Sequence, residues 1–169
     1  MFNDLIYRFK RELSYCRTMI LKIILSMATG AAILFFAWTK FGGPCKVTFL
    51  FRIPGGGITI AAYYILWFIM FALCGGETAF ICSIKNKCSY KILMYHIAAN
   101  FCLFLWYPLF FTTFSQLFAL LILIASLIIL LAELKECHCF SLIISTSIIL
   151  KAIVCTIFIY INIAFLIIN

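Results

Sequence analysis

The chain has 169 residues, of which 67% are apolar and only 11% are charged, and its mean hydropathy is +1.21. Soluble domains are about 45–50% apolar and about 25% charged, so this composition excludes a water-soluble globular protein. The net charge of +8 does not indicate nucleic-acid binding, because the basic residues lie in the gaps between apolar runs rather than on one amphipathic face.

A polar arm, residues 1–18, precedes the first apolar run and carries Arg8, Lys10, Arg11 and Arg17. A helix needs about 20 apolar residues to cross a bilayer, and the first such segment is predicted at about residues 19–38. It lacks a small-residue cleavage site followed by a polar mature region, so we expect this helix to remain in the protein.

The second helix is predicted at about residues 58–84, after a connection over residues 39–57 that is rich in glycine and proline. This connection is either a plain solvated loop or a lid over a cavity between the helices. Glu77 is the one charge in the second helix, and we expect it to point into the bundle or to lie near the cytoplasmic rim, because a carboxylate facing lipid is costly. Gly75 and Gly76 would let a neighbouring helix approach closely.

The chain is almost continuously apolar from Ile92 to Ala132, and one helix of that length would be about 60 Å long, twice the bilayer thickness. It must therefore fold back, and the Thr/Ser run 112–115 just after Pro108 is the predicted turn. This gives a third helix at about 92–111 and a fourth at about 115–132. His96 and Asn100 share one face of the third helix, which indicates either hydrogen bonds to other helices or contact with a ligand.

The fifth helix is predicted at about residues 140–168 and contains Lys151, which would pair with a carboxylate, bind an anionic ligand or extend toward the interface. The fold class is therefore all-α, an integral membrane bundle of five transmembrane helices in one domain, residues 19–169. Eight Lys and Arg residues lie in segments on the N-terminal side against three on the other side, which predicts a cytoplasmic N-terminus and an outer C-terminus.

The nine cysteines lie mostly inside or at the ends of apolar runs, where cysteine behaves as a small hydrophobe, so no disulfide framework is predicted. Cys137-His138-Cys139 has poor spacing for a zinc site, and no metal site is predicted. A membrane cysteine hydrolase pairing a cysteine with His96 or His138 stays an alternative, although no recognisable motif fixes such a pair.

Several local motifs, in order along residues 44–169, resemble the TspO/translocator-protein family of tryptophan-rich sensory proteins. They are Arg52-Ile53-Pro54 in the long connection, Tyr63 and Trp67 in the second helix, Met94-Tyr95, Asn100 and Trp106-Tyr107-Pro108-Leu109-Phe110-Phe111 in the third, and Ile161-Asn162 with Asn169 at the end. The chain has only three tryptophans and lacks the proline-tyrosine start of the family's fifth helix. It therefore looks like a divergent member of bacterial type.

The resemblance implies a membrane-embedded binding or sensory protein that holds a tetrapyrrole, such as a porphyrin or haem, or a sterol-like molecule under the 39–57 connection. The ligand-binding residues that it implies are Arg52, Pro54, Tyr63, Trp67, Tyr95, Asn100, Trp106, Phe110 and Asn162. An apolar pocket with a few polar groups and stacking aromatic rings suits such a ligand, and Arg52 would face its carboxylates. Family members are commonly dimers, which makes a homodimer a candidate assembly.

Further expectations follow from the same residues. The loss of tryptophans argues against the light-dependent porphyrin breakdown attributed to the family, so no enzymatic activity and no required cofactor are predicted. We expect the protein to lie in the lipid bilayer of a bacterial cell membrane. Its expected partner is a hydrophobic small molecule, and no nucleic-acid partner is expected. A small transporter that uses Glu77 and Lys151 is the alternative function.

Overall fold

The computed structural model describes residues 4, 6–8, 10, 20–41, 60–83, 87–111, 115–137 and 141–168. For residues 33–34, 37–38, 41, 60–64, 83, 87–89, 111 and 168 it describes the backbone alone. Most of the predicted 39–57 connection therefore lies outside the described residues.

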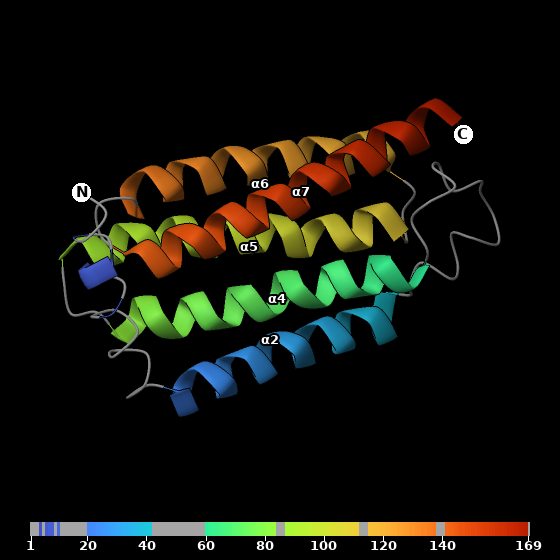
Figure 1. Ribbon diagram of the computed structural model, residues 1–169. Coiled ribbons are helices and arrows are strands. Elements are labelled where there is room, and N and C mark those ends of the chain that lie inside the picture. Colours follow the sequence, from blue (N-terminus) through green and yellow to red (C-terminus); the bar gives the residue numbers. More distant parts are fainter. Residues whose placement is uncertain are drawn as a thin grey trace.

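Within the described residues, five long helices form a single bundle: α2 (Ile20–Phe41), α4 (Ile60–Ser83), α5 (Lys87–Phe111), α6 (Gln116–Cys137) and α7 (Leu142–Ile168). They run alternately in opposite directions, so α2 begins at one end of the bundle and α7 ends at the other (Figure 1). The most extensive contacts join α5 to α6, α2 to α4 and α6 to α7. As a result, α2 lies at the edge of the bundle and is held mainly by α4 (Figure 1).

The outer surface of the helices carries many large apolar side chains. Large apolar side chains are exposed on every helix, among them Leu21 on α2 (83%), Ile128 on α6 (62%) and Ile167 on α7 (78%). Four helices, α4 to α7, are long and apolar enough to cross a membrane, whereas the described apolar part of α2, Ile20–Ala32, is shorter. Length and composition thus indicate an integral membrane protein. A fifth crossing by α2, and the side of the membrane on which each terminus lies, remain predictions.

The predicted turn in the middle of the long apolar run is confirmed, because α5 ends at Phe111 and α6 begins at Gln116. Ser115 precedes α6, and its carbonyl accepts the Ala119 N–H at 2.9 Å. The Gln116 Nε2 donates to the Phe110 carbonyl at 3.3 Å, which satisfies an acceptor at the end of α5. A serine also precedes α7, and the Ser141 Oγ accepts the Ile144 N–H at 3.3 Å as an N-cap.

Three helices extend past their predicted ends, and α2 is one of them, since it continues to Phe41 rather than ending at about residue 38. α5 begins at Lys87 rather than Ile92, and α6 continues to Cys137 rather than ending at Ala132. Hydropathy assigned these polar turns to a connection, but the helical backbone continues through them. There Lys91 Nζ on α5 forms a salt bridge with Glu136 Oε1 on α6 at 2.6 Å.

The close approach expected at the glycine pair in α4 is confirmed for Gly75. A Cβ added at Gly75 would lie 2.1 Å from the backbone oxygen of Ser26 on α2, and one added at Gly30 would lie 2.5 Å from the backbone oxygen of Phe71. Each helix thus places a glycine against the backbone of the other, as helices in membranes do where they pack most closely.

Candidate functional site

Four ionisable side chains meet inside the bundle, one from each of α4, α5, α6 and α7: Glu77, His96, Glu133 and Lys151. Each of these side chains belongs to a residue that is at most 4% exposed. They lie toward the end of the bundle where α4 and α6 finish and α5 and α7 begin. At 1.5 Å per residue, Glu133 is about 6 Å and Lys151 about 14 Å along its helix from that end, so this charged cluster lies within the apolar spans.

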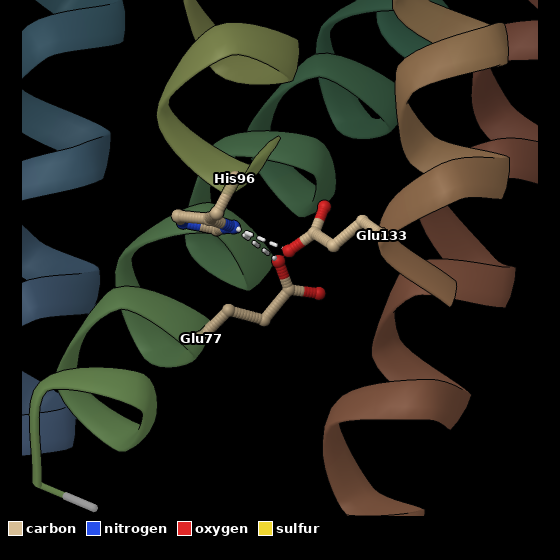
Figure 2. A group of neighbouring side chains, drawn as sticks. All are labelled: Glu77, His96 and Glu133. Atoms are coloured by element: carbon tan, nitrogen blue, oxygen red, sulfur yellow. Dashed lines mark hydrogen bonds and ion pairs between the residues drawn. The ribbon is translucent and has the colours of Figure 1, made fainter. Parts of the chain in front are cut away.

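The contacts of the charged cluster centre on one imidazole nitrogen. His96 Nδ1 lies 3.2 Å from Glu77 Oε2 and 3.2 Å from Glu133 Oε1, and Figure 2 shows the two carboxylates reaching it from α4 and α6. Lys151 Nζ forms an ion pair with the same Glu77 oxygen. The second oxygens, Glu77 Oε1 and Glu133 Oε2, are buried without a hydrogen-bond partner among the described residues. Buried carboxylates are tolerated only when paired, so Lys151 and His96 make these two possible.

The other nitrogen of His96 faces a second set of polar groups. Nε2 lies 2.8 Å from Thr78 Oγ1, 2.9 Å from Asn100 Nδ2 and 3.2 Å from the Cys74 carbonyl oxygen. The Thr78 hydroxyl donates to that carbonyl at 2.8 Å, and the Cys74 thiol donates to Asn100 Oδ1. His96 and Asn100 therefore bond across to α4, which confirms the structural role that their spacing indicated.

Two expectations for this region are confirmed and one residue was missed. Glu77 points into the bundle, and Lys151 pairs with a carboxylate. Glu133 was placed in a connection because the charged run around it ended the apolar segment. A usable signal existed, since Glu133 continues the spacing of the buried face of α6: Ala119, Leu123, Ser126, Leu130, Glu133 and Cys137.

The donor set also resembles a metal site. One ligand atom from each of Glu77, His96 and Glu133 lies within 4.8 Å of the others, and two carboxylates with an imidazole suit Zn²⁺ and related ions. Lys151 argues against this fit, because its ammonium group is paired with one of the three ligand atoms. A divalent ion would face that positive charge at close range, so the residues present fit a metal only if Lys151 is neutral or displaced.

A second group of buried side chains, the aromatic cluster, lies toward the opposite end of the bundle. It consists of Trp67 on α4, Trp106 and Phe110 on α5 and Phe158 on α7, all at most 2% exposed. The ring centroids of Trp67 and Trp106 are 5.2 Å apart, and Phe158 lies 5.3 Å from Trp67 and 5.1 Å from Trp106. The indole N–H of Trp67 is buried and has no hydrogen-bond partner among the described residues.

Asn162 on α7 forms a hydrogen bond to this cluster. With its amide oriented so that both ends are satisfied, it accepts a hydrogen bond from Trp106 Nε1 at 3.1 Å and donates to the Gln116 carbonyl at 3.2 Å. It thereby ties α7 to α5 and α6. The structure brings together four of the residues singled out from the sequence: Trp67, Trp106, Phe110 and Asn162.

The remaining predicted site residues lie elsewhere. Arg52 and Pro54 are outside the described residues, and Tyr63 is described by its backbone alone. Asn100 belongs to the surroundings of His96, as described above. Tyr95 is half-buried near the start of α5, with Lys91 Nζ 5.9 Å from its ring centroid. The residues implied by the family resemblance are therefore divided between the two ends of the bundle.

Two apolar grooves flank the contact between α2 and α4. One, of about 410 Å³, runs between α2, α4 and α7, and Glu77 is one of its lining residues. The other, of about 370 Å³, runs between α2, α4 and α5 and is lined in part by Cys74, Thr78 and Asn100. The charged cluster is thus bordered by one groove on its Glu77 side and by the other on its Thr78 and Asn100 side.

Comparison of the chain with protein-family models, with curated protein sequences and with solved structures found no match.

Proposed function

We propose that this protein binds a flat, largely apolar molecule inside the membrane, either a tetrapyrrole or a sterol-like compound, as the resemblance to the TspO family implies. The observation that carries this proposal is the aromatic cluster with its unpartnered Trp67 indole N–H. A buried donor without an acceptor is costly, and a ligand acceptor would satisfy it. The rings of the cluster stack on one another and are at most 2% exposed, so a planar ligand would insert between them and replace these ring contacts with its own.

The surroundings of the cluster support the same proposal. The 42–59 segment joins the end of α2 to the start of α4 at the end of the bundle that holds the cluster, and Arg52 within it would face the carboxylates of a porphyrin. The proposed setting is a bacterial cell membrane with a cytoplasmic N-terminus, and a homodimer is the proposed assembly.

Tryptophan fluorescence provides the test. In the Trp38→Phe variant, Trp67 and Trp106 of the aromatic cluster are the remaining indoles, so quenching reports on that cluster alone. We expect protoporphyrin or haemin to quench this emission at micromolar concentrations in detergent-purified protein. Arg52→Gln should weaken binding by about tenfold, which corresponds to about 1.4 kcal/mol, whereas His138→Gln should not. Unchanged emission with both compounds would exclude the tetrapyrrole class.

A small ion-coupled transporter is the second candidate, and the buried pair of Glu77 and Lys151 favours it. Ionisable residues inside a membrane protein commonly mark ion pathways. We expect proteoliposomes under an imposed membrane potential to show proton flux that Glu77→Gln abolishes and Glu136→Gln, near the exposed rim, leaves intact. Flux equal to that of empty liposomes would remove this candidate without affecting the first.

A further inference from the structure

The charges of the charged cluster balance only if it holds one proton in addition to that of the Lys151 ammonium group, on His96 or on one of the two carboxylates. Glu77 and Glu133 contribute two negative charges and Lys151 contributes one positive charge, which leaves one uncompensated negative charge when His96 is neutral. These groups lie inside apolar spans and are at most 4% exposed. An uncompensated charge there is far more costly than at a surface. A second proton on His96 makes the sum of the four charges zero.

While both carboxylates are ionised, the contacts at His96 Nδ1 require a proton on that atom. Two carboxylate oxygens, from Glu77 and Glu133, each lie 3.2 Å from it. Ionised carboxylates can only accept hydrogen bonds, so an unprotonated Nδ1 would direct its lone pair at both. The imidazole is therefore a hydrogen-bond donor toward α4 and α6.

The contacts at His96 Nε2 favour a proton there as well. The Cys74 carbonyl can only accept, and Thr78 has already donated its one hydroxyl proton to that carbonyl at 2.8 Å. Thr78 Oγ1, at 2.8 Å from Nε2, is then an acceptor too. Asn100 Nδ2, at 2.9 Å, is the one donor at this nitrogen among the described residues, and Asn100 Oδ1 accepts from the Cys74 thiol on its other side. Among the described residues, two acceptors and one donor therefore face Nε2, whereas the two carboxylates face Nδ1.

We propose that His96 is a proton-binding site inside the membrane, held as an imidazolium ion by Glu77 and Glu133 and balanced against Lys151. The charged and titratable groups around it are Cys74 and Glu77 from α4, Glu133 from α6 and Lys151 from α7. The proton exchanges through Thr78 and Asn100, which line the groove between α2, α4 and α5. Its release leaves the charged cluster with one net negative charge and removes the donor that joins α5 to both carboxylates.

A proton fits this position better than a metal ion does. Zn²⁺ bound to the same three atoms would leave the cluster with a net positive charge while Lys151 remains protonated, and its ligand Glu77 Oε2 is already paired with that ammonium group. A proton on His96 gives neutrality with every side chain in place. This proposal depends on the contacts of the charged cluster and on neither ligand binding nor transport.

Nitrogen NMR of the full chain in lipid nanodiscs tests the proposal directly. With [¹⁵N]histidine there are two labelled residues, His96 and His138, and His138→Gln leaves His96 as the one signal source. We expect both His96 ring nitrogens to show imidazolium shifts at pH 7. Neutral shifts for His96 at pH 7, with one protonated and one bare nitrogen, would overturn the proposal.

Two further measurements distinguish a bound proton from a bound metal ion and test the role of Glu133. Glu133→Gln removes one of the two carboxylates with little change in shape, and we expect it to abolish the imidazolium signals at pH 7; their persistence would contradict the assigned role of Glu133. Addition of Zn²⁺ should leave the wild-type signals unchanged. Loss of the Nδ1 proton signal on adding Zn²⁺, with recovery on adding a chelator, would instead assign the three atoms to a metal and overturn the proposal.

Discussion

Replacing Lys151 by methionine is expected to lower the free energy of unfolding by about 3–5 kcal/mol. The methionine side chain fills most of the same volume, so the loss comes from charge rather than from packing. Without the ammonium group, Glu77 loses its ion-pair partner inside the membrane. The measurement is reversible unfolding of the purified protein in mixed micelles with increasing denaturing detergent.

Lys135→Met provides the matched control for this variant. Lys135 is exposed near the end of α6, so the same chemical change there should alter the free energy of unfolding by no more than about 0.5 kcal/mol. Equal losses in the two variants would show that the effect of Lys151 is not due to its place in the charged cluster.

Gly75→Ala is expected to destabilise the bundle by about 1–3 kcal/mol, because its Cβ would lie 2.1 Å from the Ser26 backbone oxygen. Backbone cannot move aside as a flexible side chain can, so α2 would have to separate from α4. Because α2 is held mainly by α4, its detachment should also appear as faster protease cleavage near the N-terminus.

The neighbouring glycine supplies the control for this substitution. A Cβ at Gly76 would meet side-chain atoms of Met27 and Ile23 at 3.8 and 3.9 Å, which is ordinary contact. Gly76→Ala should therefore leave stability unchanged or raise it slightly, since alanine is the better helix former by about 1 kcal/mol. If both substitutions destabilise equally, close packing at Gly75 is not the reason.

The helices could be predicted well because one physical limit, the bilayer thickness, divides the apolar sequence. That limit placed the turn between Phe111 and Gln116 within one residue of where α6 begins. It could not locate the polar ends of α5 and α6, where lysines and glutamates continue the helix although hydropathy has already fallen. Helix ends of this kind depend on contacts such as the pair of Lys91 and Glu136, which join residues far apart in the sequence.

The candidate site was predictable residue by residue but not as an assembly. The cost of a buried carboxylate predicted that Glu77 faces inward, and the same reasoning marked Lys151 as needing a partner. Which carboxylate meets which cation depends on how four helices are rotated and shifted against one another. No local pattern encodes that arrangement, and Glu133 was missed because charge density was taken as the mark of a connection.

For the aromatic cluster too, most of the individual residues could be predicted from the sequence, whereas their assembly could not. Trp67, Trp106, Phe110 and Asn162 were singled out by motifs on three different helices, and the bundle brings them together. Phe158, which stacks on both tryptophans, carries no motif of its own. Its position in an unbroken apolar helix gave no reason to separate it from the other buried residues of α7.

The four ionisable residues are expected to act as one charge-balanced unit within the membrane, and a double-mutant cycle between Glu77 and Lys151 tests this most directly. Removing both members of a buried pair leaves no unpaired charge between them. We therefore predict that Glu77→Gln/Lys151→Met is more stable than Lys151→Met alone, with a coupling energy of about 1–3 kcal/mol. Additive losses in the double variant, with no coupling, would contradict a charge-balanced unit.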